Sequence, residues 1–135
     1  MALTLAEKTQ LCALAADSKK AEDIVVLDVG PLSSVADHFL ICSGASDRQV
    51  RAIADAIEEE LTQNGEKPLA MEGYHKGTWV LIDCADVIVH VFDDETRSFY
   101  NLERLWHRAA RVEVPGVALA MPQVSASAAL LVEEG

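Results

Sequence analysis

The chain has 135 residues, half of them hydrophobic, which suits a single domain with one core. Its 22 Asp and Glu outnumber its 11 Lys and Arg, so the formal net charge at pH 7 is -11. Because nucleic-acid affinity comes mainly from Lys and Arg that neutralise phosphates, this balance argues against docking on bare phosphate and against direct nucleic-acid specificity.

The N-terminal segment predicts a helix over residues 4–19. Thr4 and Glu7 have capping-box spacing, and Lys19 and Lys20 lie where cations suit a helix C-terminus. The segment lacks the basic region and unbroken apolar stretch of a secretion signal, and it is not Arg-rich like a transit peptide. We therefore expect a cytoplasmic protein, and the apolar runs are too short to span a membrane.

Two apolar segments then predict strands over residues 23–29 and 37–43, with Gly30-Pro31 breaking the chain between them. Ser46 and Gln49 have the spacing of a second capping box, which opens the clearest helix of the sequence. Its apolar stripe at helical spacing is Val50, Ile53, Ala54, Ile57 and Leu61. The Asn64-Gly65 pair is expected to end this helix.

The C-terminal half predicts a run of strands followed by short helices. Residues 68–72 suit a short edge strand, because Pro68 cannot donate to a ladder. Residues 78–83 and 87–92 are strong strands separated by three residues, so we expect a hairpin. Asp93-Asp94 is expected to open one short helix, and a second is expected over about residues 101–106.

These elements indicate an α+β fold, with a mixed sheet of about five strands covered by helices. Beyond Arg111 no helical or strand period is sustained. We therefore expect one domain over residues 1–111 and a flexible tail over residues 112–135.

A phosphate-handling loop is the first candidate for chemistry. Ser43-Gly44 follows a strand and precedes a helix, as in nucleotidyltransferases, whose metal ions also need carboxylates at alternate strand positions. Asp83 and Asp86 are three residues apart, which an unbroken strand points to opposite faces. Asp93 and Glu95 have the right spacing, but helix capping explains Asp93 more simply. We expect no enzyme and no cofactor, although a nucleotidyltransferase-like activity stays open as an alternative.

Metal and thiol chemistry are not indicated either. The four His residues show no metal-ligand spacing, and the three Cys residues are far apart with no C-x-x-C pair. Cys42 lies in an apolar strand, where burial keeps a thiol protonated and inert. We therefore expect no metal site and reduced thiols.

The hairpin presents two different faces. Val80 and Ile82 share a face in the first strand, and the odd-numbered Val residues of the second strand share one. If helices cover the Val face, the other face carries Trp79, Leu81 and Ile88, with polar atoms from Asp83 and His90. An apolar patch that contains Trp and has a polar rim marks an interaction site. The alternative is that helices bury both faces of the sheet.

The chain resembles the Iojap or ribosomal silencing factor family over residues 20–106. The strongest matches are WVLID at 79–83, DVIVHVF at 86–92 and FYNLERLW at 99–106, supported by residues 23–29, 33–37, 41–44 and 46–50. One departure is Cys84-Ala85, which replaces an aromatic-Gly pair before Asp86. The resemblance implies a nucleotidyltransferase-like fold that has lost its catalytic carboxylates.

The resemblance also implies a non-enzymatic function. Family members bind a basic protein of the large ribosomal subunit, the fourteenth of its L series, and sterically block joining of the small subunit, which represses translation. The acidic charge suits such a basic partner, or it simply keeps the chain in solution. A large-subunit assembly factor and a homodimer formed through the same patch are alternatives. The residues expected to make the ribosomal contact are Trp79, Leu81, Asp83, His90, Tyr100 and Arg104.

Overall fold

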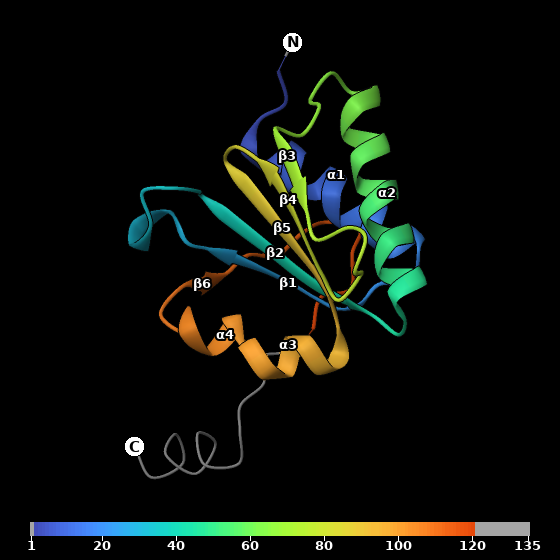
Figure 1. Ribbon diagram of the computed structural model, residues 1–135. Helices are drawn as coiled ribbons and strands as arrows, with labels where there is room; N and C mark the ends of the chain where they lie inside the picture. Colours follow the sequence, from blue (N-terminus) through green and yellow to red (C-terminus); the bar gives the residue numbers. More distant parts are fainter. Residues whose placement is uncertain (1, 121–135) are drawn as a thin grey trace, which may run out of the picture.

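The computed structural model describes residues 2–120 and shows a mixed sheet between two layers of helices (Figure 1). In chain order the elements are α1 (Leu5–Ser18), β1 (Glu22–Asp28), the 3-10 helix η1 (Gly30–Leu32), β2 (His38–Gly44), α2 (Asp47–Gln63), β3 (Ala70–Glu72), β4 (Trp79–Cys84), β5 (Val87–Asp93), α3 (Asp94–Tyr100), α4 (Leu102–Leu105) and β6 (Ala110–Arg111). The predicted helices and strands are all present, with ends that differ by one or two residues.

The six strands have the order β3-β4-β5-β2-β1-β6. Strands β2 and β5 are parallel, and the other neighbours are antiparallel. The predicted α+β class and mixed sheet are confirmed, and the additional strand is the two-residue β6 beside β1. The predicted edge strand β3 lies at the opposite edge of the sheet, and it begins at Ala70, two residues after Pro68.

One face of the sheet is covered by α1 and α2. The stripe of α2 is fully buried, and it packs against the Val face of β4 and β5 that the sequence assigned to the core. These buried side chains belong to one continuous apolar cluster, which includes Val80, Ile82, Val87, Val89 and Val91. This cluster is the main core of the domain.

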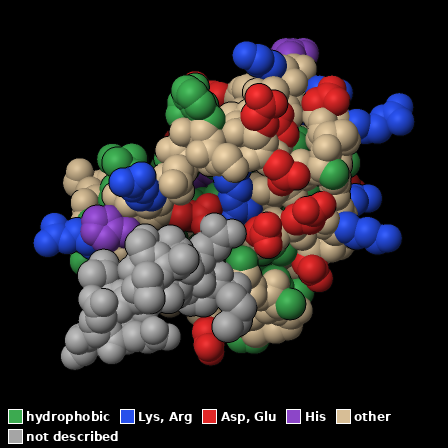
Figure 2. Space-filling view, turned by 90° about the horizontal axis from the view of Figure 1, so that it is seen from below, with side chains coloured by type: hydrophobic (Ala, Val, Ile, Leu, Met, Phe, Trp, Pro, Cys, Tyr) green, Lys and Arg blue, Asp and Glu red, His purple; other side chains and the backbone are tan. Residues whose placement is uncertain are grey.

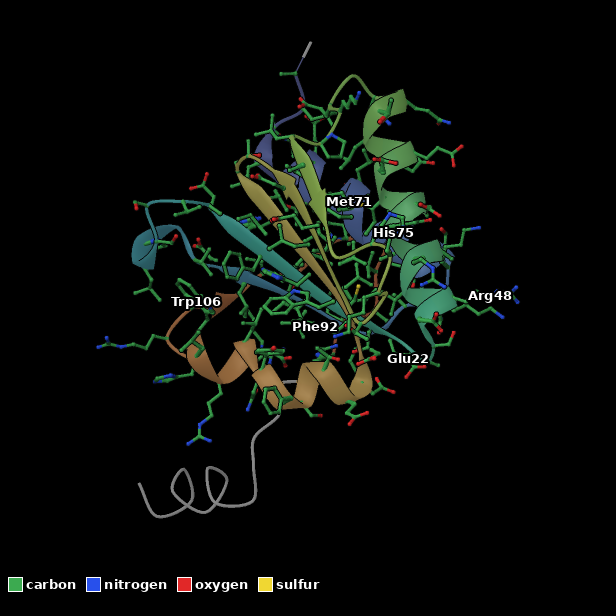
Figure 3. The ribbon with its side chains drawn as sticks, viewed as in Figure 1. Glu22, Arg48, Met71, His75, Phe92 and Trp106 are labelled. Carbon is green, nitrogen blue, oxygen red and sulfur yellow. The ribbon has the colours of Figure 1, made fainter. Side chains whose placement is uncertain are left out.

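The other face is only partly covered, by α3 and α4 (Figure 1). Its buried cluster contains Phe39 and Phe92, with Trp79, Ile88 and Trp106 packed against it. Figure 3 shows Phe92 and Trp106 on this side, between the sheet and the two short helices. The sequence left open whether helices cover one face of the sheet or both. In the structure, α3 and α4 cover part of the second face and leave the rest uncovered.

The helix caps follow the predicted signals closely. Thr4 and Glu7 form the complete capping box of α1. At α2 the Ser46 hydroxyl accepts from the Gln49 N–H, but the Gln49 side chain accepts from Ala45 and donates to the carbonyls of Lys19 and Lys20. Gln49 thus ties the start of α2 to the end of α1 instead of closing the box.

The hairpin turn is shorter than the expected three-residue separation. Cys84 pairs with Val87, so only Ala85 and Asp86 form the turn. Ala85 has φ 71°, the left-handed region that favours Gly, and its N–H donates to the Asp83 carboxylate at 2.9 Å. Ala85 stands where the family pattern has Gly, so its positive φ strains the turn. The hairpin still forms.

Residues 112–120 differ from the expected tail. Val114 is buried in the main core, and Val112, Val117 and Leu119 pack against it. Backbone N–H groups of Val112 and Ala120 donate to carbonyls of β1 at 2.9 and 2.8 Å. Residues 112–120 are therefore packed against the domain, although their sequence shows no helical or strand period. The rest of the expected tail, residues 121–135, lies outside the described residues.

Candidate functional site

The candidate site is an aromatic cluster centred on Trp79, at the first residue of β4. The Trp79 ring lies 4.9 Å from the Phe92 ring and 4.8 Å from the Tyr100 ring, between centroids. Phe92 is fully buried directly opposite Trp79 in the hairpin, and Tyr100 is the last residue of α3. The end of α3 therefore brings an exposed aromatic ring against a half-buried one.

A hydrogen bond to the buried His90 fixes the orientation of Trp79. The Trp79 indole N–H donates to His90 Nδ1 at 3.1 Å, which assigns the neutral tautomer with the proton on Nε2. His90 is 5% exposed and also packs edge-on against Phe39. Its Nε2 is buried without a partner among the described residues. Burial lowers the pKa of His90 to about 4, so the ring is neutral at physiological pH.

The outer part of the site is apolar and exposed. The exposed fractions are 79% for Phe99, 52% for Tyr100 and 72% for Leu105. Phe99, Tyr100 and Leu105 line a shallow hollow together with Arg104 and His107. Large apolar side chains that stay exposed beside a packed cluster are typical of a protein interaction surface. We call Trp79, Phe99, Tyr100 and Leu105 the docking cluster.

The structure brings together most of the residues that the sequence assigned to the contact. Trp79, His90 and Tyr100 touch one another through Trp79, and Arg104 shares the hollow with Tyr100. Leu81 is half-buried directly opposite His90 in the hairpin.

Asp83 is the exception. It lies four residues further along β4, about 13 Å from Trp79 at the usual rise of a strand. Its carboxylate accepts from the N–H of Ala85 and so supports the turn.

The sequence reasoning missed Phe99 and Leu105, the two most exposed members of the docking cluster. Both lie within the matching string at residues 99–106, next to residues that were singled out. The sequence signal for them is the presence of large apolar residues in two short helical segments. In the structure, neither α3 nor α4 fully buries a side chain.

The loop that resembles a phosphate site is occupied by the protein's own side chains. Ser43 is 1% exposed, and its hydroxyl accepts from Arg97 Nη1 at 2.8 Å. Arg97 in turn pairs with Glu103 at 2.9 Å. A Cβ on Gly44 would lie 2.9 Å from the Val50 N atom, so Gly44 permits close packing of α2 on β2. These contacts explain both residues without a bound nucleotide.

Two of the carboxylates considered for a metal site also make contacts within the protein. Asp93 caps α3 by accepting from the Thr96 N–H at 2.7 Å, and Asp86 pairs with Lys8 at 2.7 Å. Within residues 2–120, no group of three or more His, Cys, Asp or Glu is placed to hold a metal ion. Asp23 and Asp94 line the same hollow as Ser43, together with the Arg97–Glu103 pair.

The cysteines are buried and unpaired in the described part of the chain. Burial raises the pKa of Cys42 to about 12, which keeps its thiol protonated. A hydrogen bond with Cys84 and burial raise the pKa of Cys12 well above its usual value. The raised pKa values keep the thiols of Cys12 and Cys42 protonated at neutral pH.

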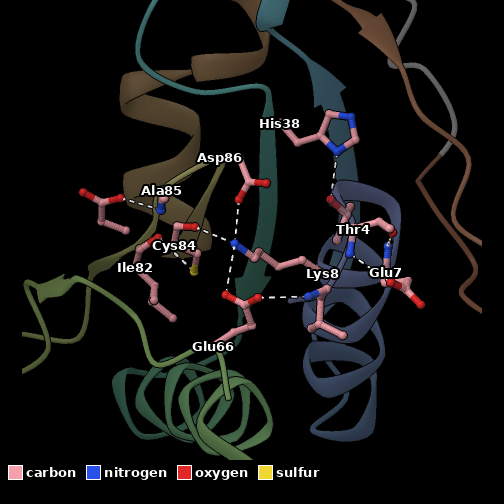
Figure 4. Close-up of polar contacts among 12 residues, drawn as sticks. Thr4, Glu7, Lys8, His38, Glu66, Ile82, Cys84, Ala85 and Asp86 are labelled. Atoms are coloured by element: carbon pink, nitrogen blue, oxygen red, sulfur yellow. Dashed lines mark hydrogen bonds and ion pairs between the residues drawn. The ribbon is translucent and has the colours of Figure 1, made fainter. Parts of the chain in front are cut away.

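A polar network supports the hairpin turn on the side of α1 (Figure 4). The ammonium of Lys8, a residue 7% exposed, donates to the Cys84 carbonyl at 3.1 Å and to Asp86, and it lies 3.6 Å from Glu66. Burial alone would lower the pKa of Lys8, but the hydrogen bond and charge of Asp86, aided by Glu66, raise it above its usual value. Lys8 thus stays charged and joins three segments that are distant in sequence.

Comparison with known proteins decides the family. The family described as "Ribosomal silencing factor during starvation" matches residues 2–130. The chain belongs to this family. A ribosomal silencing factor of Bacillus subtilis (strain 168) is 52% identical over 97 residues, which cover 72% of this chain and 82% of the relative. A solved Chromobacterium violaceum structure, that of protein CV0518, superposes with a TM-score of 0.77 at 31% identity, covering 90% of this chain and 98% of the other.

More distant members of the family come from eukaryotic organelles. The chloroplastic protein Iojap of Zea mays is 37% identical over 106 residues, 76% of this chain and 45% of the relative. A mouse protein named "Mitochondrial assembly of ribosomal large subunit protein 1" is 31% identical over 91 residues, 65% of this chain and 40% of the relative. The predicted family membership is therefore confirmed. Among the described residues, no helix has the length and apolar character needed to cross a membrane.

Proposed function

We propose that this silencing-factor homologue docks on the large ribosomal subunit through the docking cluster and sterically prevents the small subunit from joining. The contact is proposed to be the fourteenth protein of the L series, and the site of action the cytoplasm. The observation that supports this most is the exposure of Phe99, Tyr100 and Leu105 around Trp79. The family name of the relatives supports a ribosomal partner.

The physical basis is the apolar area that docking would remove from water. Aromatic side chains bury much surface and lose little conformational freedom, so they dominate interface energies. Trp79 is held in place from below by His90 and Phe92, which reduces the ordering cost of binding. Such a surface can bind tightly without making or breaking a bond, and the proposed mechanism is non-enzymatic.

The test compares two leucines with the same exposure. Leu105 and Leu69 are each 72% exposed, but Leu69 lies next to the hairpin-turn end of β4, opposite to the end that carries Trp79. We expect Leu105→Ala and Tyr100→Ala to weaken cosedimentation with large subunits, the latter by about thirty-fold. Leu69→Ala should bind normally. Equal binding by all three variants would contradict the proposed docking surface.

The steric part needs a separate readout. Added protein should lower the fraction of joined ribosomes formed from purified mature subunits on a density gradient, and Tyr100→Ala should not. We also expect no magnesium-dependent nucleotide incorporation by this protein. Incorporation that disappeared in Asp83→Ala or Asp93→Ala would favour the enzyme alternative.

A role in assembly is a second candidate, favoured by the name of the mouse relative. Its binding surface would be the same, so the two roles differ only in the particle that is bound. Deletion of the gene should leave incomplete large subunits if the role is in assembly, whereas silencing predicts complete large subunits that join too readily. The docking cluster could also pair with a second copy, in which case Leu105→Ala should lower the mass of the free protein measured by sedimentation.

A further inference from the structure

The docking cluster is bordered by positive charge, although the whole molecule is strongly acidic. Residues 104–111 contain three Arg and one His and no acidic residue, in a chain of net charge -11. Arg104, His107 and Arg108 are exposed, and we call these three residues the basic rim. Figure 2 shows basic and His side chains beside apolar ones at the left of the view, while acidic side chains and further basic ones lie towards the right.

The charges of the basic rim are available to a partner. Two other arginines are paired internally, Arg97 with Glu103 and Arg51 with Asp47, whereas Arg48 and Arg111 form no ion pair among the described residues. Within residues 2–120, neither Arg104 nor Arg108 forms an ion pair. His107 Nδ1 lies 3.0 Å from the Arg104 carbonyl, so this ring nitrogen contacts the protein's own backbone. Arg104 and His107 line the same hollow as Phe99, Tyr100 and Leu105, so the rim and the docking cluster form one continuous surface.

We infer that the basic rim binds the phosphodiester backbone of ribosomal RNA while the docking cluster binds protein. This inference rests on the proposed function, because it takes the large subunit as the partner. The negative charge of a ribosomal subunit resides mainly in its RNA, which carries one charge per phosphate, and a guanidinium can bind a phosphate through two parallel hydrogen bonds. Basic ribosomal proteins would repel the rim. An acidic protein surface is the competing partner that the experiment must distinguish.

The experiment measures affinity for intact large subunits and for the purified fourteenth L-series protein, each over a range of salt concentrations. The variants are Arg108→Gln and the double variant Arg104→Gln/Arg108→Gln, in the full chain. Arg48→Gln is the matched control, since Arg48 is an exposed arginine on α2 at the opposite side of the molecule from Trp106 (Figure 3). Glutamine keeps much of the side-chain length and removes only the charge and the fork of donors.

For intact subunits, we expect the slope of log affinity against log salt to fall by about 0.7–0.9 for each phosphate contact removed. The isolated protein partner should bind Arg108→Gln as it binds the wild type, because Arg108 lies outside the hollow of the docking cluster, and Arg48→Gln should change neither measurement. If Arg108→Gln loses affinity for both the intact subunit and the isolated protein, the rim binds protein. If the salt slope on intact subunits is unchanged in the Arg variants, the rim makes no phosphate contact. Either result overturns the inference.

The proposed function has its own control in the same series. Tyr100→Ala should lose affinity for both the isolated protein and the intact subunit, because the docking cluster is assigned to protein. If Tyr100→Ala binds normally while the Arg variants lose their salt dependence, the docking proposal fails and the basic rim stands. The two proposals can therefore fail separately.

Discussion

The indole N–H of Trp79 donates to Nδ1 of His90 at 3.1 Å, so a buried neutral imidazole holds the central aromatic residue of the docking cluster. Protonated His90 would carry an N–H on Nδ1 as well, and two donors would then face each other. The geometry of the docking cluster therefore depends on His90 staying neutral.

Stability is expected to fall in mild acid because of His90. Its pKa is about 4 in the folded protein against a usual value of 6.5, so the unfolded chain binds more protons between these values. This contribution to the free energy of unfolding is complete above pH 6.5 and amounts to about 3 kcal/mol. It is lost progressively as the pH falls to about 4. Urea melts at several pH values measure it. His90→Gln, whose side chain can still accept from Trp79 but does not titrate, should lose this part of the pH dependence; parallel pH profiles for both proteins would contradict the assignment.

Trp79 is expected to serve both the fold and the contact. Its ring is half-buried on Phe92, so Trp79→Ala should lower the free energy of unfolding by about 2–3 kcal/mol, less than a fully buried aromatic would cost. Tyr100→Ala removes a ring that is 52% exposed and should cost less than about 1 kcal/mol. Circular dichroism melts of both variants check this order. A Trp79→Ala protein as stable as wild type would show that the ring contributes to binding alone.

Lys8 is expected to hold the hairpin turn against α1. Lys8→Met keeps the aliphatic length but removes the buried ammonium that bonds Cys84 and Asp86, and we expect a loss of about 2 kcal/mol in stability. Lys67 is exposed, so Lys67→Met is the matched control and should be neutral within about 0.5 kcal/mol. A double-mutant cycle with Asp86→Asn measures the pair itself, and additive effects would mean that Lys8 and Asp86 do not interact.

Ala85→Gly is expected to stabilise the protein. Ala85 has φ 71°, a region that costs a residue with a Cβ about 1–2 kcal/mol, whereas Gly occupies it freely. The flexibility that Gly adds to the unfolded chain offsets part of the gain, so we expect a net increase of about 0.5–1 kcal/mol. Ala52→Gly in the middle of α2 should have the opposite sign, because no positive φ is relieved there. A loss of stability in Ala85→Gly would show that the turn is not strained.

The local elements and the division of the hairpin into two faces follow from the amino-acid sequence alone. Helix caps such as Thr4 with Glu7, and the alternation of Val80 and Ile82 with Trp79 and Leu81, depend on residues a few positions apart. The motif strings also indicated the family, since their order along the chain is specific. Such signals are readable because their physical cause is local.

Which side chains meet depends on the packing of elements that are distant in the sequence. Arg97 donates to the Ser43 hydroxyl across 54 positions of sequence, and residues 112–120 are buried against β1 although their sequence shows no helical or strand period. The packing of α3 and α4 on the sheet set Tyr100 against Trp79 and left Phe99, Leu105 and the basic rim exposed around them. These contacts depend on strand register and on how separate elements pack. The energy of a contact between distant segments therefore cannot be predicted from the sequence of either segment alone.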